Sequence, residues 1–259
     1  MFVFFALSMA IATIDASKLT LSPPATIVEV DTGKLKGDLV RLSWSPDGKQ
    51  LYIQTIERDR SGAIKAAHHY LAELDGRQPK SVDQEPPWST TYWGWKSAQS
   101  APRMAALKID VEQAQKRVSS ANVPTGGALA KGGIDAGGAA GGAATGFGAD
   151  DGISAAFQQQ MVNVFTLKLK GEVVGEFVNA AAVPGLTFGW APAGTGLIAF
   201  ANPSGHVVVM DDRGRKKEIA ESKSALLPAW SEDGKRLAYF ERTGKNKATL
   251  KIVEVAASE

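Results

Sequence analysis

Short runs of apolar and β-branched residues, separated by turn residues, recur along the whole chain. In the C-terminal half these runs fall at 197–200, 206–210, 237–240 and 249–255. Comparable runs fall earlier in the chain, at 26–30, 51–53, 70–74 and 163–167. Runs of this length, bounded by glycine, proline, asparagine or aspartate, are typical of β-strands rather than of helices. The chain is therefore predicted to be all-β, with strands joined by tight turns.

A tryptophan followed by a turn and an apolar strand occurs four times. The full motif stands twice, as Trp44-Ser45-Pro46-Asp47-Gly48-Lys49 and as Trp230-Ser231-Glu232-Asp233-Gly234-Lys235. In such a motif the Ser and Asp side chains can bond backbone amides of the turn, and glycine supplies a positive φ. We therefore interpret the repeated positions as structural residues of a β-hairpin: Trp44, Asp47, Gly48, Trp95, Trp190, Gly194, Trp230, Asp233 and Gly234.

Each hairpin leads into two further strands, which makes a unit of four. The run at 70–74, for example, is followed by a turn and by a short run at 80–82. Four short antiparallel strands form one blade of a β-propeller. Successive motif tryptophans are spaced roughly as blades of about 40 to 50 residues require, except that the gap from Trp95 to Trp190 is twice as long. The sequence predicts a β-propeller of four to five four-stranded blades.

A stretch rich in glycine and alanine accounts for the longer gap. Residues 126–152 contain few large apolar side chains. Such a stretch cannot bury enough surface to offset the entropy lost on ordering. We predict residues 111–160 to be a mostly disordered insertion in the propeller, with a short helix over 110–120 at its start.

The last copy of the repeat has no fourth strand of its own. Its third strand, at 249–255, lies almost at the end of the sequence. The apolar run at 26–30 is therefore predicted to pair there as the fourth strand, which closes the ring and removes an exposed edge. A ring completed by a second copy of the chain is the alternative, so a monomer or a ring-completing dimer is expected.

The motif that begins at Trp44, with its counterpart at Trp230, resembles the WD-like repeat of the TolB-like β-propeller family. The resemblance covers most of residues 25–256. It implies a propeller fold and an extracytoplasmic setting.

The N-terminus carries a separate pattern. Residues 2–14 are apolar and uncharged, but too few for the roughly 20 residues that a membrane-spanning helix needs. Ala10-Ile11-Ala12 has the small residues that signal peptidase recognises, and Ala16 is a second candidate. No basic residue precedes Lys18, so a buried strand is the alternative. We predict a signal peptide over 1–16, a propeller domain over 17–259, a periplasmic or secreted location, and no stable membrane span.

Composition matters here mainly through what it excludes. The 259 residues carry a net charge of +2, which provides no field to attract nucleic acid. The absence of cysteine excludes disulfides, thiolate nucleophiles and cysteine-bound metals. Neither a Gly-x-Ser-x-Gly elbow nor a phosphate-binding loop with a Lys-Ser or Lys-Thr pair is present. No cofactor, metal or nucleic-acid partner is predicted.

The polar residues of the sequence offer few candidates for catalysis. Asp47 and Asp233 occupy the same turn of two repeats, which indicates a structural device and not a catalytic pair. His68 and His69 are neighbours on a strand, so they face opposite sides and cannot bind one metal together. The charged run at 211–218 is predicted to be a solvated turn. No catalytic residue is proposed.

Aromatic residues outside the repeat are the best candidates for binding. Trp88 and Tyr92 lie in the connection before Trp95, where the repeat requires no aromatic. Loop aromatics of this kind can bind a partner through stacking and a large buried area. Lys96 and Arg103 lie nearby in sequence and could add polar contacts. The alternative is that the aromatics pack the connection onto its own blade.

These patterns predict an extracytoplasmic, non-catalytic propeller that acts as a scaffold for a protein or another ligand. A carbohydrate-binding module that uses Trp88 and Tyr92 is one alternative. A hydrolase or lyase with a site in the central channel, built from residues scattered among blades, is the other. The predicted partner is a protein or a glycan.

Overall fold

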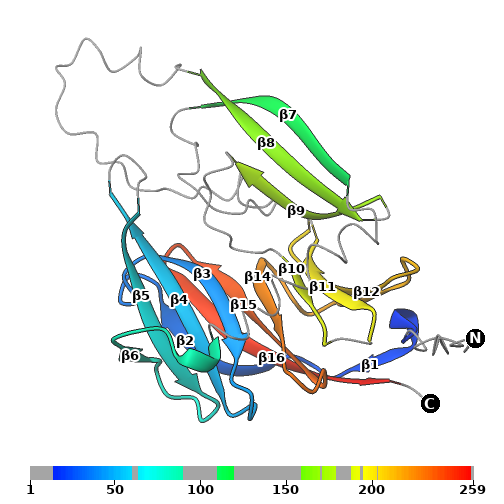
Figure 1. The fold of residues 1–259 in the computed structure, drawn as a ribbon, viewed down its shortest axis with the longest axis horizontal. Helices are drawn as coiled ribbons and strands as arrows, with labels where there is room; N and C mark the ends of the chain where they lie inside the picture. The colour runs from blue at the N-terminus through cyan, green and yellow to red at the C-terminus, as the bar shows by residue number, and fades with distance from the viewer. Residues whose placement is uncertain are drawn as a thin grey trace, which may run out of the picture.

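The fold is described from a computed structural model, which covers residues 14–59, 64–89, 110–119, 159–169, 171–178, 188–192, 195–202 and 204–257. In these ranges the regular structure is strand, apart from the 3-10 turn η1 (Ala16–Lys18) and a helical turn at 87–89. The strands form four antiparallel sheets (Figure 1). No helix among the described residues is long and apolar enough to cross a membrane. The predicted all-β class is confirmed.

The first two sheets are simple meanders of four strands. The first sheet contains β3 (Asp38–Trp44), β4 (Gln50–Arg58), β5 (Ile64–Glu73) and β6 (Lys80–Val82). The second sheet contains β10 (Phe188–Trp190), β11 (Leu197–Ala201), β12 (Val207–Asp211) and β13 (Lys216–Ile219). Both follow the strand order expected of a propeller blade.

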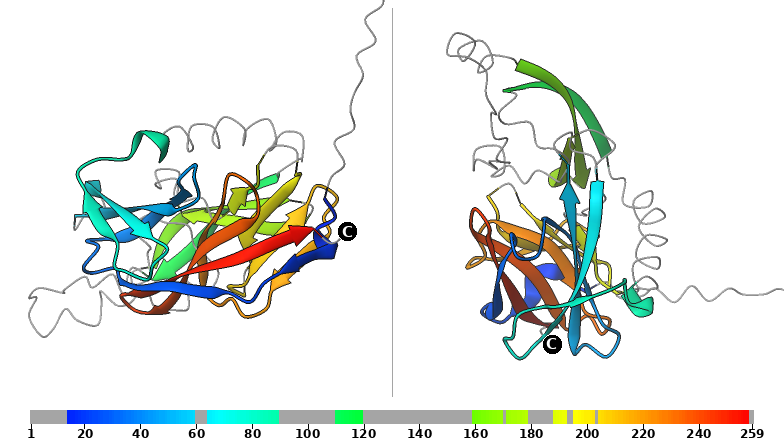
Figure 2. Two further views of the ribbon diagram at one scale, coloured as in Figure 1. Left: turned by 90° about the horizontal axis from the view of Figure 1, so that it is seen from below. Right: turned by 90° about the vertical axis from the view of Figure 1, so that its left-hand side faces the viewer.

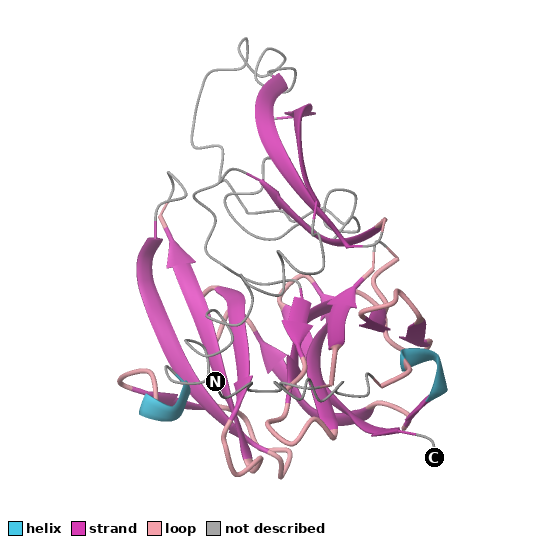
Figure 3. Cartoon of the chain, turned by 45° about the vertical axis from the view of Figure 1, so that its right-hand side comes forward, coloured by secondary structure: helices cyan, strands magenta, loops and turns pink. Residues whose placement is uncertain are grey.

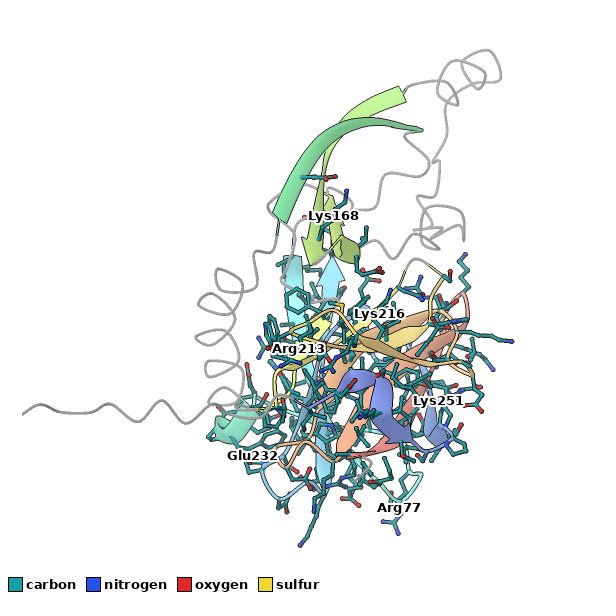
Figure 4. The ribbon with its side chains drawn as sticks, turned by 90° about the vertical axis from the view of Figure 1, so that its right-hand side faces the viewer. Arg77, Lys168, Arg213, Lys216, Glu232 and Lys251 are labelled. Atoms are coloured by element: carbon teal, nitrogen blue, oxygen red, sulfur yellow. The ribbon has the colours of Figure 1, made fainter. Side chains whose placement is uncertain are left out.

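The other two sheets differ from a simple meander. The third sheet contains β14 (Ala225–Trp230), β15 (Arg236–Gly244) and β16 (Lys247–Ala257), joined by β1 (Leu19–Leu21) and β2 (Ala25–Asp31). The fourth sheet contains β7 (Asp110–Ser119), β8 (Gln159–Leu169) and β9 (Glu172–Val178). An ion pair from Lys216 Nζ to Glu172 Oε1 (2.8 Å) links β13 to β9 (Figure 4).

The predicted helix at 110–120 is wrong. These residues form strand β7, which pairs with β8 from Asp110 opposite Lys168 to Ser119 opposite Gln159. The Glu-, Gln- and Lys-rich sequence favours a helix locally, but pairing along a whole strand overrides so weak a preference. Strand β7 occupies the start of the predicted insertion, and residues 120–158 lie outside the described part of the chain.

The N-terminal strands complete the third sheet, as the sequence predicts. Strand β2 pairs antiparallel with the first half of β16, and β1 pairs with its last residues. Between them the N–H of Ser22 donates to the carbonyl of Glu254 (3.0 Å), and the N–H of Glu254 donates to Ser22 Oγ (2.9 Å). Figure 2 shows β2 running beside β16. The outer edge of β16 is thus covered by the other end of the same chain.

The apolar core lies on both faces of the third sheet. One cluster joins it to the first sheet and includes Trp44, Leu51 and Phe240, and another joins it to the second sheet and includes Trp230 and Tyr239. Strand β14 of the third sheet contacts both β3 of the first sheet and β10 of the second. Figure 3 shows that strands make up almost all of the regular structure in the described chain. Antiparallel sheets of about four strands that pack in succession on one another are the blades of a β-propeller. The predicted all-β propeller class is therefore confirmed, whereas the number of four to five blades stays a prediction.

Two motif tryptophans link neighbouring blades by hydrogen bonds. Trp44 Nε1 donates to the carbonyl of Ala229 (3.0 Å), and Trp230 Nε1 donates to the carbonyl of Gly189 (3.2 Å). In both cases the acceptor directly precedes the tryptophan of the adjacent blade. The repeat therefore requires tryptophan for its indole N–H as well as for its volume.

Alanine in place of Gly189 is expected to destabilise the protein by about 1–3 kcal/mol, because a Cβ there would lie 2.5 Å from the carbonyl oxygen of Pro228. The backbones of β10 and β14 would have to move apart. Urea unfolding of the full chain measures the effect. Gly244→Ala is the matched control, since its Cβ would meet only ordinary contacts of 3.6 Å or more. Equal stability of the two variants would contradict this close approach.

Candidate functional site

The repeated turns use their carboxylates to hold the backbone. In the first copy Ser45 Oγ donates to Asp47 Oδ1 (2.6 Å) and accepts from the N–H of Gln50 (3.0 Å). The N–H of Lys49 also donates to Asp47 Oδ1 (3.1 Å). Gly48 completes the turn with φ +66°. The bond from Ser45 lowers the pKa of Asp47, so this carboxylate is an ionised acceptor within its own turn.

The second full copy reproduces these contacts. Ser231 Oγ donates to Asp233 Oδ1 (2.5 Å) and accepts from the N–H of Arg236 (2.9 Å). Gly234 has φ +71°, and the bond from Ser231 lowers the pKa of Asp233. Two carboxylates with the same local partners in two blades are parts of a repeated turn.

Arg236 also couples the two copies. Its guanidinium lies 4.5 Å from the centre of the Trp44 ring, a cation–π contact between the third and first sheets. A Cβ added at Gly48 would lie 2.0 Å from Arg236 Nη2. Glycine at position 48 therefore serves both the turn and the contact with the next blade.

The strongest candidate for a binding site lies on the face of the first sheet that is turned away from the third. We call it the Trp88 cluster: Arg41, Tyr52, His69, Glu85 and Trp88. The Trp88 ring, which is partly exposed, makes a T-shaped contact with the fully buried Tyr52 ring, with centroids 6.4 Å apart. Tyr52 Oη lies 2.6 Å from His69 Nδ1, and Arg41 pairs with Glu85 at the rim.

A second contact fixes the segment that carries Trp88. Ser89 is fully buried, and its Oγ lies 3.1 Å from the Oγ of Ser43 on β3. The ion pair of Arg41 with Glu85 holds the other end of the segment to the same strand. The indole of Trp88 is thus presented from a short segment attached to the sheet at both sides.

Burial keeps the centre of the Trp88 cluster uncharged. Desolvation, reinforced by the Glu85 carboxylate, raises the pKa of Tyr52 above its ordinary value. Desolvation lowers the pKa of His69 below its ordinary value. At neutral pH a phenol and a neutral imidazole therefore share the short contact, and the charged groups lie at the rim. The cluster presents the partly exposed Trp88 indole, with the ion pair of Arg41 and Glu85 beside it.

The histidines point to separate partners. His69 faces Tyr52, whereas His68 Nε2 lies 3.3 Å from Glu57 Oε2 on the opposite face of β5. The predicted alternation of these neighbours is confirmed. His206 Nδ1 lies 2.6 Å from Glu218 Oε1. Within the described ranges no three His, Asp or Glu side chains are grouped as metal ligands would be.

Asp211 is a residue whose importance the sequence did not indicate. The charged run at 211–218 was expected to be a solvated turn, which is wrong for Asp211 because its side chain is completely buried. It accepts hydrogen bonds from the backbone N–H groups of Ala16 (3.1 Å), Arg213 (2.9 Å) and Arg215 (3.0 Å). Arg215 Nε donates to it as well (2.6 Å).

Several predicted site residues lie outside the described part of the chain. They are Tyr92, Lys96 and Arg103 of the proposed binding set, together with Trp95 and Gly194 of the repeat. Of the binding set, the structure places Trp88. The residues that gather around it, Tyr52 and His69 above all, were not predicted, because they belong to strands that looked like ordinary sheet.

The blades described above define the class as an all-β propeller. No known family profile matches the chain. No curated protein matches it either. Among solved structures it is similar to one titled "Structure of Dos1 propeller", with 9% identity and a TM-score of 0.21. That alignment covers 82% of this chain and 41% of the other. Membership of the TolB-like family stays a prediction.

Proposed function

We propose that the chain is an extracytoplasmic, non-catalytic binding scaffold, with the Trp88 cluster as its contact surface. The observation that carries the proposal is the Trp88 indole, which is partly exposed, fixed to a rigid sheet and independent of the repeat. Aromatic side chains held in one orientation lose little entropy on binding and commonly dominate interfaces. The export part of the proposal rests on the apolar N-terminal run and on the resemblance to TolB-like repeats.

The roles of the carboxylates support a scaffold over an enzyme. Asp47, Asp233 and Asp211 each accept several hydrogen bonds from their own surroundings. Catalytic acids and bases need a pKa near the working pH, whereas the pKa of each of these groups is lowered. They are suited to fixing turns and not to moving protons at neutral pH.

A protein is the partner that this surface favours. Arg41 and Glu85 provide one cation and one anion beside the aromatic centre, an arrangement suited to the mixed apolar and polar chemistry of a peptide chain. Aromatic and arginine residues are enriched at the centres of protein interfaces. A glycan that stacks on Trp88 is the competing possibility, and the experiment below separates the two.

Trp88→Ala is expected to reduce capture of the partner at least tenfold, because loss of a central aromatic typically costs about 2 kcal/mol or more of binding free energy. The tagged full chain is used to capture proteins from the native cell envelope, and mass spectrometry quantifies each captured protein. Ile64→Ala is the control, since Ile64 is 55% exposed on β5 of the same sheet but outside the cluster.

Three outcomes distinguish the possibilities. Proteins that the native chain and Ile64→Ala capture equally, and Trp88→Ala loses, support the proposal. Capture that is insensitive to Trp88 contradicts the assignment of the contact surface. Binding on a glycan array that depends on Trp88, with no protein captured, would replace the protein partner by a carbohydrate.

A further inference from the structure

Strand β5 extends beyond the strand that covers its outer edge. It has ten residues, but β6 pairs with it only at 69–71, and Figure 1 shows β5 continuing past β6. After Val82 the chain leaves β5 and turns toward β3, where the segment that carries Trp88 is attached. Within the described ranges no strand pairs with the outer edge of β5 over residues 64–68.

The third strands of the second and third sheets are covered along nearly their whole length. Strand β12 pairs with β13 over 207–210, so that only Asp211 at its end is left. Strand β16 pairs with β2 and with β1, and Ser22 bonds to it between the two. The repeat therefore does not require an uncovered third strand, and the open stretch of β5 calls for another explanation.

The main-chain groups of Ala67 point to this open side. The carbonyl of Gln50 accepts from the N–H of Ser45 (2.9 Å), so the main-chain groups of Gln50 point away from β5. Because successive residues of a strand point these groups to opposite sides, those of Thr55 point to β5, where His68 lies opposite. The neighbour of His68, Ala67, therefore directs its N–H and its carbonyl away from β4 and toward the open side.

The open edge is accessible and adjoins the Trp88 cluster. The side chain of Ala67 lies on the same face of β5 as His69 of the cluster, because residues two apart in a strand share a face. Ala67 and Lys65 are both exposed. Lysine commonly protects a sheet edge, but Lys65 Nζ pairs with Glu57 Oε1 on β4 (2.6 Å), which draws its charge away from the open side.

We propose that the partner places an extended segment along residues 64–68 of β5 and adds a strand to the first sheet. A row of main-chain donors and acceptors is complementary to the main chain of another strand, and proteins use such edges to bind peptides. The inference rests on the proposed function, because it takes the partner to be a protein that also contacts Trp88. Ile64→Ala changes no main-chain group, so it remains a valid control for Trp88→Ala.

The test uses random linear peptides displayed on phage, which are selected on the immobilised full chain. Enriched peptides are synthesised, and fluorescence anisotropy measures their affinity. Ala67→Pro is expected to weaken binding at least about tenfold, because proline removes the N–H at the open side and its ring obstructs an added strand. Since this N–H points away from β4, the pairing of β4 with β5 is retained. Ala67→Ser keeps the N–H and is expected to bind as the native chain does.

A second readout needs no variant of the protein. The enriched peptide is N-methylated at alternate residues, in two complementary versions. A strand pairs through only one of its two edges, so one version is expected to lose binding and the other to keep it. Equal binding of both versions would contradict pairing through the main chain.

The remaining outcomes separate this inference from the proposed function. Failure to enrich any peptide, or equal binding to Ala67→Pro and the native chain, would overturn the inference. Binding that is lost in Trp88→Ala but not in Ala67→Pro would overturn it while supporting the Trp88 contact surface. Binding that depends on Ala67 and not on Trp88 would support the open edge and contradict that surface. A dimer in light scattering that Ala67→Pro converts to a monomer would replace the partner's strand by that of a second copy.

Discussion

Replacement of Trp230 by alanine is expected to destabilise the protein by about 3–5 kcal/mol, the range found for large buried aromatics. Trp230 has no exposed surface and lies in the cluster between the second and third sheets. The change opens a cavity and leaves the carbonyl of Gly189 without the indole N–H that it accepts. Urea unfolding followed by far-UV circular dichroism measures the loss.

Trp230→Phe separates the two contributions. Phenylalanine retains most of the ring volume but cannot donate to the carbonyl of Gly189, so a loss of about 1–3 kcal/mol is expected. Both variants unfolding at the same urea concentration as the native chain would contradict the role of Trp230 as a link between the third and second sheets.

Removal of the Asp211 carboxylate is expected to cost about 3 kcal/mol or more, because Asp211→Ala leaves Arg215 and three backbone N–H groups without their common acceptor. Glu218→Ala is a control in the same charged run, since Glu218 is an exposed residue paired with His206 at the surface. A cost below 1 kcal/mol for Asp211→Ala would contradict its role as the buried centre of this turn.

The contribution of Asp211 should also depend on pH. Burial opposes its ionisation, but hydrogen bonds from Ala16 and Arg215 outweigh burial and lower its pKa below the ordinary value of 3.8. A lowered pKa in the folded state contributes stability that is complete above the unfolded pKa and is lost as the pH falls through the folded pKa. The difference in stability between the native chain and Asp211→Ala should therefore be constant near neutral pH and shrink below about pH 4.

The repeat could be predicted from sequence because its contacts are local. The bonds of Ser45 with Asp47 and Gln50 span at most five residues, and the same residue types recur around Ser231. The pairing of β2 with β16 was also predictable from sequence. The last repeat has only three strands of its own, and the N-terminal segment contains a strand that belongs to no other repeat.

The long-range polar contacts could not be predicted in this way. Asp211 and Ala16 are 195 positions apart, and nothing in a charged run distinguishes a buried carboxylate from a solvated one. Trp88 was recognised because the repeat does not explain it, but Tyr52 and His69 looked like ordinary strand residues. The helix predicted at 110–120 failed for a related reason, since pairing with β8 is a distant interaction that local propensity cannot reveal.

Closure of the last sheet by the N-terminal strand of the same chain can be tested with an engineered disulfide, since the chain has no cysteine of its own. Glu29 on β2 lies directly opposite Thr249 on β16, and directly opposed strand residues are close enough for a disulfide. The double variant Glu29→Cys with Thr249→Cys is oxidised, and the products are analysed by non-reducing electrophoresis and intact-mass spectrometry.

Glu29→Cys combined with Glu254→Cys is the control, because Glu254 lies opposite Ser22 and far along β16 from Glu29. A cross-linked monomer from the first pair and free thiols in the control are the expected result, whereas a cross-linked dimer or free thiols in both would contradict closure within one chain.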